Sequence, residues 1–201
     1  MGLWLYDAPL VLASGSAIRR AVLEDAGIPV ETIPADLDER AVEAQSGIEP
    51  NAVAALLARE KARKVAASLP GRVILGADQI LALGARRFSK PQDRAGARAQ
   101  LLALRGHTHE LQSAAALVRD DAVLFETLEQ PRLTMRAFSD AFLDRYLDHA
   151  GAAVTHSVGG YQVEGLGIQL FEQIEGDHFA ILGLPLLPLL GFFRSERWLA
   201  A

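Results

Sequence analysis

The segment from residue 10 to residue 20, LVLASGSAIRR, constrains the fold more than any other part of the sequence. It begins with an apolar run of strand length, and a short polar turn that ends at Ser16 follows. After the turn, apolar residues recur at helical spacing as far as Gly27, a residue type that commonly ends helices. The sequence therefore predicts a buried strand, a loop and a helix, which together form the first unit of an α/β fold.

The loop of this first unit has the features of an anion-binding site. The N-terminus of a helix presents free N–H groups and the positive end of the helix dipole, which favours a phosphate. Ser16 can cap the helix, and Arg19 and Arg20 add positive charge next to the loop. A capped helix with two solvated arginines explains the same residues, so this segment alone leaves both interpretations open.

Composition limits the classes of protein that the chain can belong to. Of the 201 residues, 22% are charged and half are hydrophobic. This hydrophobic content is enough for one large core or two closely packed lobes. Because there is no cysteine, disulfide scaffolds and thiolate metal sites are excluded, and we expect a cytoplasmic protein. We find no signal-peptide pattern, and prolines interrupt the most apolar tract, so we expect no membrane partner. The net charge of −5 argues against a nucleic-acid partner.

Acidic residues and one lysine follow in the next part of the chain. Asp36, Asp38 and Glu39 come after a second short strand and could hold a divalent cation, because such an ion bound with phosphates needs only one or two carboxylates. A solvated acidic turn is the alternative. Lys61 lies on an amphipathic helix predicted over residues 51–69, where a single lysine is ordinarily solvated.

The strand predicted over residues 73–83 contains the strongest candidate for a catalytic group. This strand is apolar except for Gly76, Asp78 and Gln79. A carboxylate in a buried strand is costly unless it is paired, hydrogen-bonded or bound to a metal, so Asp78 requires a partner. Gly76 would allow another backbone to approach closely. Farther along the chain, Lys90 lies in a segment that the following proline keeps extended.

Beyond residue 106 the pattern changes to two long strands, over residues 107–120 and 122–138. His107 and His109 are two residues apart and would share a face of the first strand. They lack a nearby third ligand, so we expect ordinary surface histidines rather than a metal site.

The rest of the chain predicts a helix capped by Ser139, a hairpin around Gly176 and a final helix that begins near Pro185. Between the two helices, Glu164 is a lone carboxylate on a glycine-rich loop. Such a carboxylate is a candidate for contact with a ligand, and a solvated loop acid is the alternative.

Six motifs in this order resemble those of the Maf family. They are LVLASGSAIRR, DLDE at 36–39, REKA around Lys61, LGADQ at 75–79, SKP at 89–91 and EGLGIQLFEQIEGD through LGLP. The resemblance covers almost the whole chain and implies a single domain over residues 1–201 with an elongated α/β fold, akin to that of inosine triphosphate pyrophosphatases. It implies a mixed twisted sheet flanked by helices, two lobes with the active site in the cleft between them, and a homodimer.

The resemblance also implies an activity, a metal and a set of site residues. Proteins of this family hydrolyse a nucleoside triphosphate to its monophosphate and pyrophosphate with a divalent metal, Mg²⁺ or Mn²⁺. The residues that match phosphate-binding positions are Ser16, Arg19, Arg20, Lys61 and Lys90. Glu39 would hold the metal, and Asp78, which matches the family's proton acceptor, would hold the metal or deprotonate the attacking water.

Three positions bear on the choice of base: Ile18, Gln79 and Glu164. They depart from members that act on dTTP and UTP, which resemble SPRR, GADT and GIQG, and favour the branch similar to enzymes that act on 7-methyl-GTP. A carboxylate accepts two hydrogen bonds, which suits the N1–H and N2–H₂ donors of guanine. That branch typically has tryptophan where this chain has Ile18, so stacking is not available from that position.

Three other functions stay open at this point. One is a dTTP or UTP pyrophosphatase of the same family, and another is a non-catalytic nucleotide-binding regulator of septum formation. Intact Asp78 and Lys90 argue against lost catalysis. The third is a nucleic-acid-binding protein that uses the basic cluster at residues 59–64, which the net charge of −5 disfavours.

Overall fold

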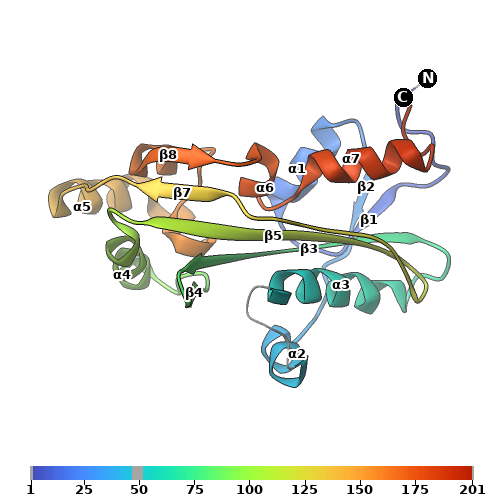
Figure 1. The fold of residues 1–201 in the computed structure, drawn as a ribbon, viewed down its shortest axis with the longest axis horizontal. Helices are drawn as coiled ribbons and strands as arrows, with labels where there is room; N and C mark the ends of the chain where they lie inside the picture. The colour runs from blue at the N-terminus through green and yellow to red at the C-terminus, as the bar shows by residue number, and fades with distance from the viewer. Residues whose placement is uncertain (1, 47–51, 201) are drawn as a thin grey trace. The chain divides into compact units, whose positions relative to one another are not determined.

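The computed structural model describes residues 2–46 and 52–200 (Figure 1). The chain divides into two compact units. The first unit comprises residues 1–79, 113–129 and 178–201, and the second comprises residues 80–112 and 130–177. Two long strands, β3 and β5, continue from one unit into the other.

The first third of the chain contains the predicted strand, helix, strand and helix, together with a helix at residues 39–46 that the sequence did not predict. The strands are β1 (Leu10–Leu12), β2 (Val30–Thr32), β3 (Val73–Leu83), β4 (Arg86–Phe88), β5 (Thr108–Arg119), β6 (Ala122–Glu129), β7 (Arg132–Met135) and β8 (Phe171–Glu175). The α-helices are α1 (Ala17–Asp25), α2 (Glu39–Ser46), α3 (Val53–Ala66), α4 (Arg94–Leu104), α5 (Asp140–Ala150), α6 (His178–Ile181) and α7 (Leu186–Ser195). In the described ranges, no helix has both the length and the hydropathy that a membrane-spanning segment requires.

The strands form one mixed sheet, which confirms the predicted α/β class. Their order is β2-β1-β3-β5-β7-β8, with β4 paired to β3 and β6 paired to β5. The strands β2, β1 and β3 are parallel, whereas β6, β7 and β8 join through antiparallel pairings. The second long strand that the sequence predicts is divided at Pro131 into β6 and β7, because proline cannot donate a hydrogen bond to a neighbouring strand.

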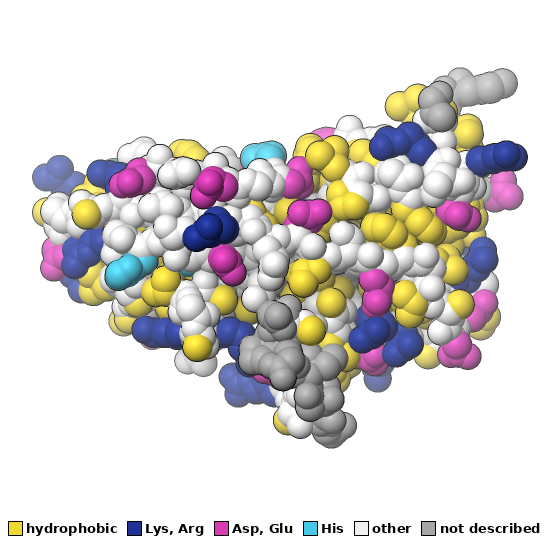
Figure 2. Space-filling model, in the orientation of Figure 1, with side chains coloured by type: hydrophobic (Ala, Val, Ile, Leu, Met, Phe, Trp, Pro, Cys, Tyr) yellow, Lys and Arg dark blue, Asp and Glu magenta, His cyan; other side chains and the backbone are white. Residues whose placement is uncertain are grey.

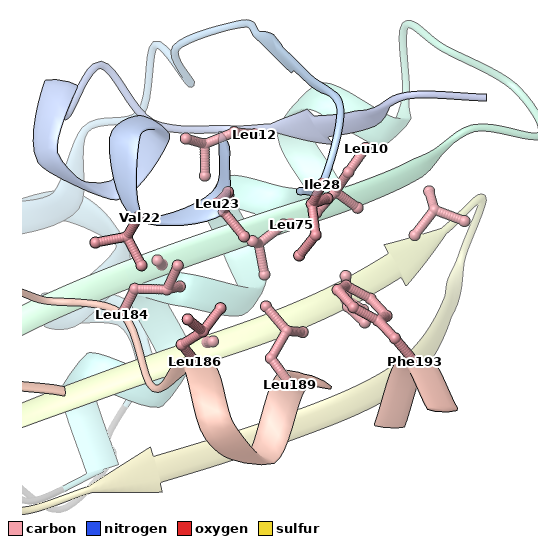
Figure 3. Close-up of a cluster of buried hydrophobic side chains, with 14 of the residues drawn as sticks. Leu10, Leu12, Val22, Leu23, Ile28, Leu75, Leu184, Leu186, Leu189 and Phe193 are labelled. Carbon is pink, nitrogen blue, oxygen red and sulfur yellow. The ribbon is translucent and has the colours of Figure 1, made fainter. Parts of the chain in front are cut away.

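The first unit has a hydrophobic core on each face of its part of the sheet. On one face, α1 and α7 cover β1 and β3, and Leu12, Leu23, Leu75 and Phe193 are completely buried there (Figure 3). On the other face, α3 packs against the alternate residues of the same strands, such as Ile74. Because successive residues of a strand point to opposite faces, β3 supplies side chains to both cores.

Gly76 lies where α3 crosses β3, as the sequence predicts. A Cβ atom at this position would lie 1.9 Å from the carbonyl oxygen of Ala58 and 2.8 Å from the backbone nitrogen of Ala62. These distances leave no room for a side chain. The glycine therefore allows α3 to lie directly on the strand, and α3 is the helix that carries Lys61.

The second unit contains a buried histidine where the sequence predicts a surface one. His109 is 1% exposed, and its Nε2 lies 2.7 Å from the hydroxyl of Tyr161, also buried. Its Nδ1 is buried without a hydrogen bond among the described residues. The prediction was wrong because Tyr161 is 52 residues away in the sequence, and only the tertiary structure brings it over this face of β5.

His109 should make the protein less stable in acid. Burial lowers the pKa of His109 to about 4, so the folded protein favours the neutral imidazole. The unfolded chain binds this proton near pH 6.5, so stability declines as pH falls from there toward 4, by about 2 kcal/mol between pH 7 and pH 5. Urea unfolding at these two pH values should show that His109→Gln, which can still bond Tyr161, loses less stability than the wild type. An equal loss in both proteins would remove His109 from the acid response.

One predicted element at the end of the chain is wrong. The sequence predicts a hairpin around Gly176, but only β8 precedes this glycine and the short helix α6 follows it. Gly176 has a φ of +111°, and a Cβ there would lie 2.9 Å from Pro131. Glycine is therefore required here by a close contact and by a positive φ. The sequence cannot distinguish these two requirements from that of a hairpin turn. The predicted caps Asp93 and Ser139 and the start of α7 after Pro185 are confirmed.

Candidate active site

The first turn of α1, directly after the loop that follows β1, carries the half-buried Arg19. Ser16 caps α1, since its hydroxyl accepts a hydrogen bond from the backbone N–H of Arg19 at 3.4 Å. The Arg19 guanidinium then donates to three groups: the hydroxyl of Ser14 at 3.1 Å, the carbonyl of Ala77 at 2.9 Å and the carbonyl of Gly183 at 2.7 Å. Nη2 has no hydrogen bond among the described residues. Arg19 is therefore fixed by the fold, with one donor group left for a ligand.

A second cluster joins β3, α3 and the start of α2. The Lys61 ammonium lies 2.6 Å from a carboxylate oxygen of Asp78 and 2.6 Å from one of Glu39. Asp78 is 7% exposed, so the buried carboxylate has the cationic partner that the sequence requires of it. The close packing of α3 at Gly76 positions this lysine, because Lys61 lies one turn beyond Ala58 on the same helix.

The two clusters influence each other electrostatically. Burial raises the pKa of Asp78, while the Lys61 ammonium and, more weakly, the Arg19 guanidinium act in the opposite direction. Burial likewise lowers the pKa of Arg19, and the charges of Asp78 and Glu39 partly compensate. Two cations and two carboxylates are thus gathered near the end of β1. A carboxylate whose pKa is raised by burial is a better proton acceptor than a solvated one.

A break in strand pairing lies at the same place. The strand β1 pairs with β3 at Ile74 and Leu75, and β4 pairs with it from Leu81 onward. Neither strand pairs with residues 76–80, where the Ala77 carbonyl instead accepts a hydrogen bond from Arg19. Ligands of open α/β sheets bind beyond the carboxyl ends of such strands. At this break the Arg19 guanidinium, rather than a neighbouring strand, contacts the backbone next to Asp78.

Gln79 is held on the face of the sheet opposite to Asp78. Its amide nitrogen lies 2.8 Å from the hydroxyl of Ser113, 3.1 Å from the carbonyl of Ala180 and 3.0 Å from that of Ile181. Since carbonyl oxygens only accept hydrogen bonds, the NH₂ group must face them. The amide oxygen, which has no hydrogen bond among the described residues, is directed toward Gly183. Gln79 can therefore offer a ligand an acceptor only.

The other predicted site residues are placed differently. Arg20 is exposed and forms an ion pair with Glu24 at 2.7 Å, one helical turn away. Lys90 and Glu164 are exposed and belong to the second unit, Lys90 before α4 and Glu164 in a turn after the short 3₁₀ helix Val158–Gly160. Ile18 is half-buried on α1. Their roles toward a nucleotide stay predictions.

Two polar residues of this region were not among the predicted site residues, although the sequence already indicates the Ser14 hydroxyl in the first loop. Ser14 accepts hydrogen bonds from Arg19 and from the backbone N–H of Ser16. Ser113 is completely buried and donates to the carbonyl of Ala180 at 2.6 Å while it accepts from Gln79. In the sequence, Ser113 is the single polar residue of the otherwise apolar run 113–118, which could have indicated a buried hydrogen-bonding role.

Comparison with known proteins agrees with the motifs. The family described as Maf-like protein matches residues 9–196. A nucleoside triphosphate pyrophosphatase of Rhodopseudomonas palustris (strain HaA2) is 58% identical over 201 residues, which is 100% of both chains. A 7-methyl-GTP pyrophosphatase of Mesorhizobium japonicum is 53% identical over 189 residues, which cover 92% of this chain and 95% of that one.

One solved structure shows a weaker likeness. It is a nucleoside-triphosphatase (dITP/XTP pyrophosphatase) from Mycobacterium abscessus, with a TM-score of 0.43 and 15% identity over 94% of this chain and 95% of that one. No conclusion about function follows from a likeness at this level. The match over residues 9–196 and the identity to whole relatives establish that the chain belongs to the Maf family.

Proposed function

We propose that this protein is a nucleoside triphosphate pyrophosphatase that acts on 7-methyl-GTP or a related modified guanine nucleotide, in the cytoplasm. The observation that carries the proposal is the buried carboxylate of Asp78 beside the Lys61 ammonium and close to Arg19. Relatives 50–58% identical over nearly the whole chain are named nucleoside triphosphate pyrophosphatases, which supports the reaction class. Hydrolysis of a triphosphate needs cations for the phosphates and a group that accepts the proton of water.

The carboxylates of Asp78 and Glu39 suit a divalent metal that arrives with the nucleotide. Each places one oxygen 2.6 Å from the Lys61 Nζ, so the two carboxylates lie close together, and each keeps a second oxygen for an ion. Among the described residues, no group of three histidine or acidic side chains could hold a metal alone. Mg²⁺ is typically bound by one or two carboxylates together with substrate phosphates, so this pair fits Mg²⁺ or Mn²⁺. Such an ion would supply charge neutralisation at the phosphates.

The basic residues of the proposed phosphate site differ in the hydrogen-bond donors that each has left for a phosphate. Arg19 would contribute Nη2 while its other nitrogens keep the loop and the residue 183 segment in place. Lys61 keeps one of its three ammonium donors for a phosphate oxygen while it contacts the two carboxylates. Ser16 would add the N-terminus of α1. Arg20 would have to leave its exposed ion pair with Glu24, a small cost, and Lys90 needs no such change.

In the proposed reaction, Asp78 orients a water molecule and accepts its proton as the water attacks the α-phosphorus. The bond from this phosphorus to the bridging oxygen breaks, and pyrophosphate leaves. Negative charge moves onto the leaving group, where Arg19 and Lys61 would stabilise it more in the transition state than in the ground state. The raised pKa of Asp78 favours its role as proton acceptor.

The proposed preference for guanine rests on two hydrogen-bond acceptors. Gln79 has only its amide oxygen to offer, because its NH₂ group is bound to Ser113, Ala180 and Ile181. Glu164 is an exposed carboxylate without a hydrogen bond among the described residues. Acceptors complement the N1–H and N2–H₂ groups of guanine better than they complement uracil or thymine, which present two carbonyl oxygens. The relative from Mesorhizobium japonicum is named a 7-methyl-GTP pyrophosphatase, which supports this choice.

We expect Glu164→Gln to change base selectivity. The amide would turn an NH₂ group toward a guanine donor, which costs about 1–3 kcal/mol, or roughly 5- to 150-fold in kcat/KM. The same amide can donate and accept, so kcat/KM for UTP should hold or rise. The measurement is the ratio of kcat/KM for 7-methyl-GTP and UTP in the wild type and the variant, at one pH and one metal concentration. An unchanged ratio with both activities lowered would instead make Glu164 a catalytic or metal-binding residue.

A further inference from the structure

A hollow of about 340 Å³ lies between α1 and α6, outside the cluster of Asp78 and Lys61. The side chains of Ile18 on α1 and of Phe179 and Leu182 in and after α6 form its walls, and all three are half-buried against the core. Val22 and Leu186, both visible in Figure 3, contribute from the core. This volume falls in the range of about 300–1,000 Å³ that is typical of small-molecule sites.

The hollow combines apolar walls with negative charge. Asp25 lines it and is exposed, and its carboxylate forms no hydrogen bond or ion pair with any described residue. Asp25 is also the last residue of α1, whose final turn contains no basic residue. The carboxyl end of a helix carries partial negative charge, which adds to that of the carboxylate. His178 completes the rim at the start of α6.

The hollow adjoins the proposed phosphate site through two consecutive pairs of residues. Ile18 and Leu182 line the hollow, and the residues that directly follow them, Arg19 and Gly183, are joined by a hydrogen bond of 2.7 Å. A Cβ on Gly183 would lie 3.4 Å from the Arg19 guanidinium and 3.6 Å from the amide oxygen of Gln79. Two of the residues that line the hollow are therefore the sequence neighbours of Arg19 and Gly183. A nucleotide whose phosphates contact Arg19 could place its base in the hollow.

We propose that this hollow binds the purine ring of the substrate and selects the positively charged ring of 7-methylguanine through Phe179 and Asp25. The proposal rests on the proposed function and names two specificity residues, Asp25 and Phe179, in addition to Ile18, Gln79 and Glu164. A flat cationic ring matches the hollow because it gains from contact with an aromatic face and from a nearby carboxylate. Phe179 would replace the stacking that Ile18 cannot supply.

The test is binding of the monophosphate product, which separates recognition of the base from turnover. Dissociation constants for 7-methyl-GMP and GMP are measured by calorimetry in the wild type, in Asp25→Asn and in Phe179→Leu. Asp7→Asn, which removes a charge from an exposed site outside the hollow, and Phe142→Leu, in the second unit, are the matched controls. We expect Asp25→Asn to weaken 7-methyl-GMP at least about fivefold and GMP less than twofold, because only the methylated ring carries the charge.

Phe179→Leu should weaken both nucleotides, with the larger loss again for 7-methyl-GMP, while both controls bind like the wild type. If Asp25→Asn and Phe179→Leu bind 7-methyl-GMP within twofold of the wild type, the hollow does not hold the base. Should the wild type still release pyrophosphate from 7-methyl-GTP in that case, only this inference fails and the proposed function stands. A wild type that cleaves no nucleoside triphosphate would overturn the proposed function and this inference together.

Discussion

Replacing Asp78 by asparagine should leave a folded protein that binds nucleotide almost normally and turns it over at least 100-fold more slowly. The expected loss follows from the usual contribution of a general base, about 10²–10⁴-fold. Asparagine has nearly the same shape as aspartate but cannot accept a proton, and Lys61 keeps Glu39 as a partner in the variant. The measurement is kcat for 7-methyl-GTP, together with circular dichroism and the dissociation constant of the product.

A matched control for this variant is Asp144→Asn. Asp144 pairs with Arg98 on the surface of the second unit and has no part in the proposed chemistry, so its removal should leave kcat unchanged. A kcat of Asp78→Asn within tenfold of the wild type would remove Asp78 from the chemical step. If turnover falls because nucleotide affinity falls in parallel, Asp78 is a binding residue instead.

We expect Gly76→Ala to destabilise the protein more than alanine at any other described glycine of the first unit. Its Cβ would lie 1.9 Å from the carbonyl oxygen of Ala58, so α3 must move away from β3. Overpacking against backbone should lower the free energy of unfolding by about 3 kcal/mol or more. Because Lys61 moves with α3, the folded fraction should also lose turnover. Urea unfolding and kcat at a temperature where the variant is still folded measure the two effects.

Gly191→Ala provides the comparison for Gly76→Ala. Gly191 lies within α7, and a Cβ there would have no heavy atom within 4 Å. Alanine favours a helix over glycine by about 0.5–1 kcal/mol, so this variant should be as stable as the wild type or more so. If both variants lose the same unfolding free energy, the close contact between α3 and β3 is not the reason that position 76 requires glycine.

The sequence was sufficient for elements whose signals are local. The strand, loop and helix from residue 10 onward were predictable because apolar spacing and the Ser16 cap act within a few residues. A close backbone contact at Gly76 was predictable, since a glycine in a buried strand commonly marks one, but its partner, α3, was not. That Asp78 needs a partner also followed from its apolar neighbours, and the structure identifies this partner as Lys61.

Long-range contacts account for what the sequence could not show. Arg19 and Arg20 are adjacent and chemically alike, yet Arg19 bonds to Gly183, 164 residues away, while Arg20 pairs with its helix neighbour Glu24. From the sequence, Gln79 could act toward a ligand as a donor or as an acceptor. In the structure its NH₂ group donates to Ser113 and to the carbonyl of Ala180, which leaves only the acceptor. In both cases the fold decides which atoms of a side chain are left for a ligand.

The surface bears on the alternative that the chain binds nucleic acid. Figure 2 shows acidic and basic side chains interspersed on the face drawn, and the net charge is −5. Within the basic cluster at residues 59–64, Arg59 and Arg63 form ion pairs with carboxylates, and Lys61 contacts Glu39 and Asp78. These pairings reduce the positive charge available for a phosphate backbone.

The most direct test of the proposed reaction is cleavage of 7-methyl-GTP by the wild type in water enriched in ¹⁸O, with Mg²⁺ or Mn²⁺ and with a chelator as control. Attack of water at the α-phosphorus places one ¹⁸O atom in 7-methyl-GMP and none in pyrophosphate, and mass spectrometry of the two products reads this difference. We predict the label in the monophosphate, no cleavage with the chelator, and a higher kcat/KM for 7-methyl-GTP than for GTP, dTTP or UTP. Label in pyrophosphate, release of orthophosphate with a nucleoside diphosphate, or no cleavage of any of the four nucleotides would contradict the account.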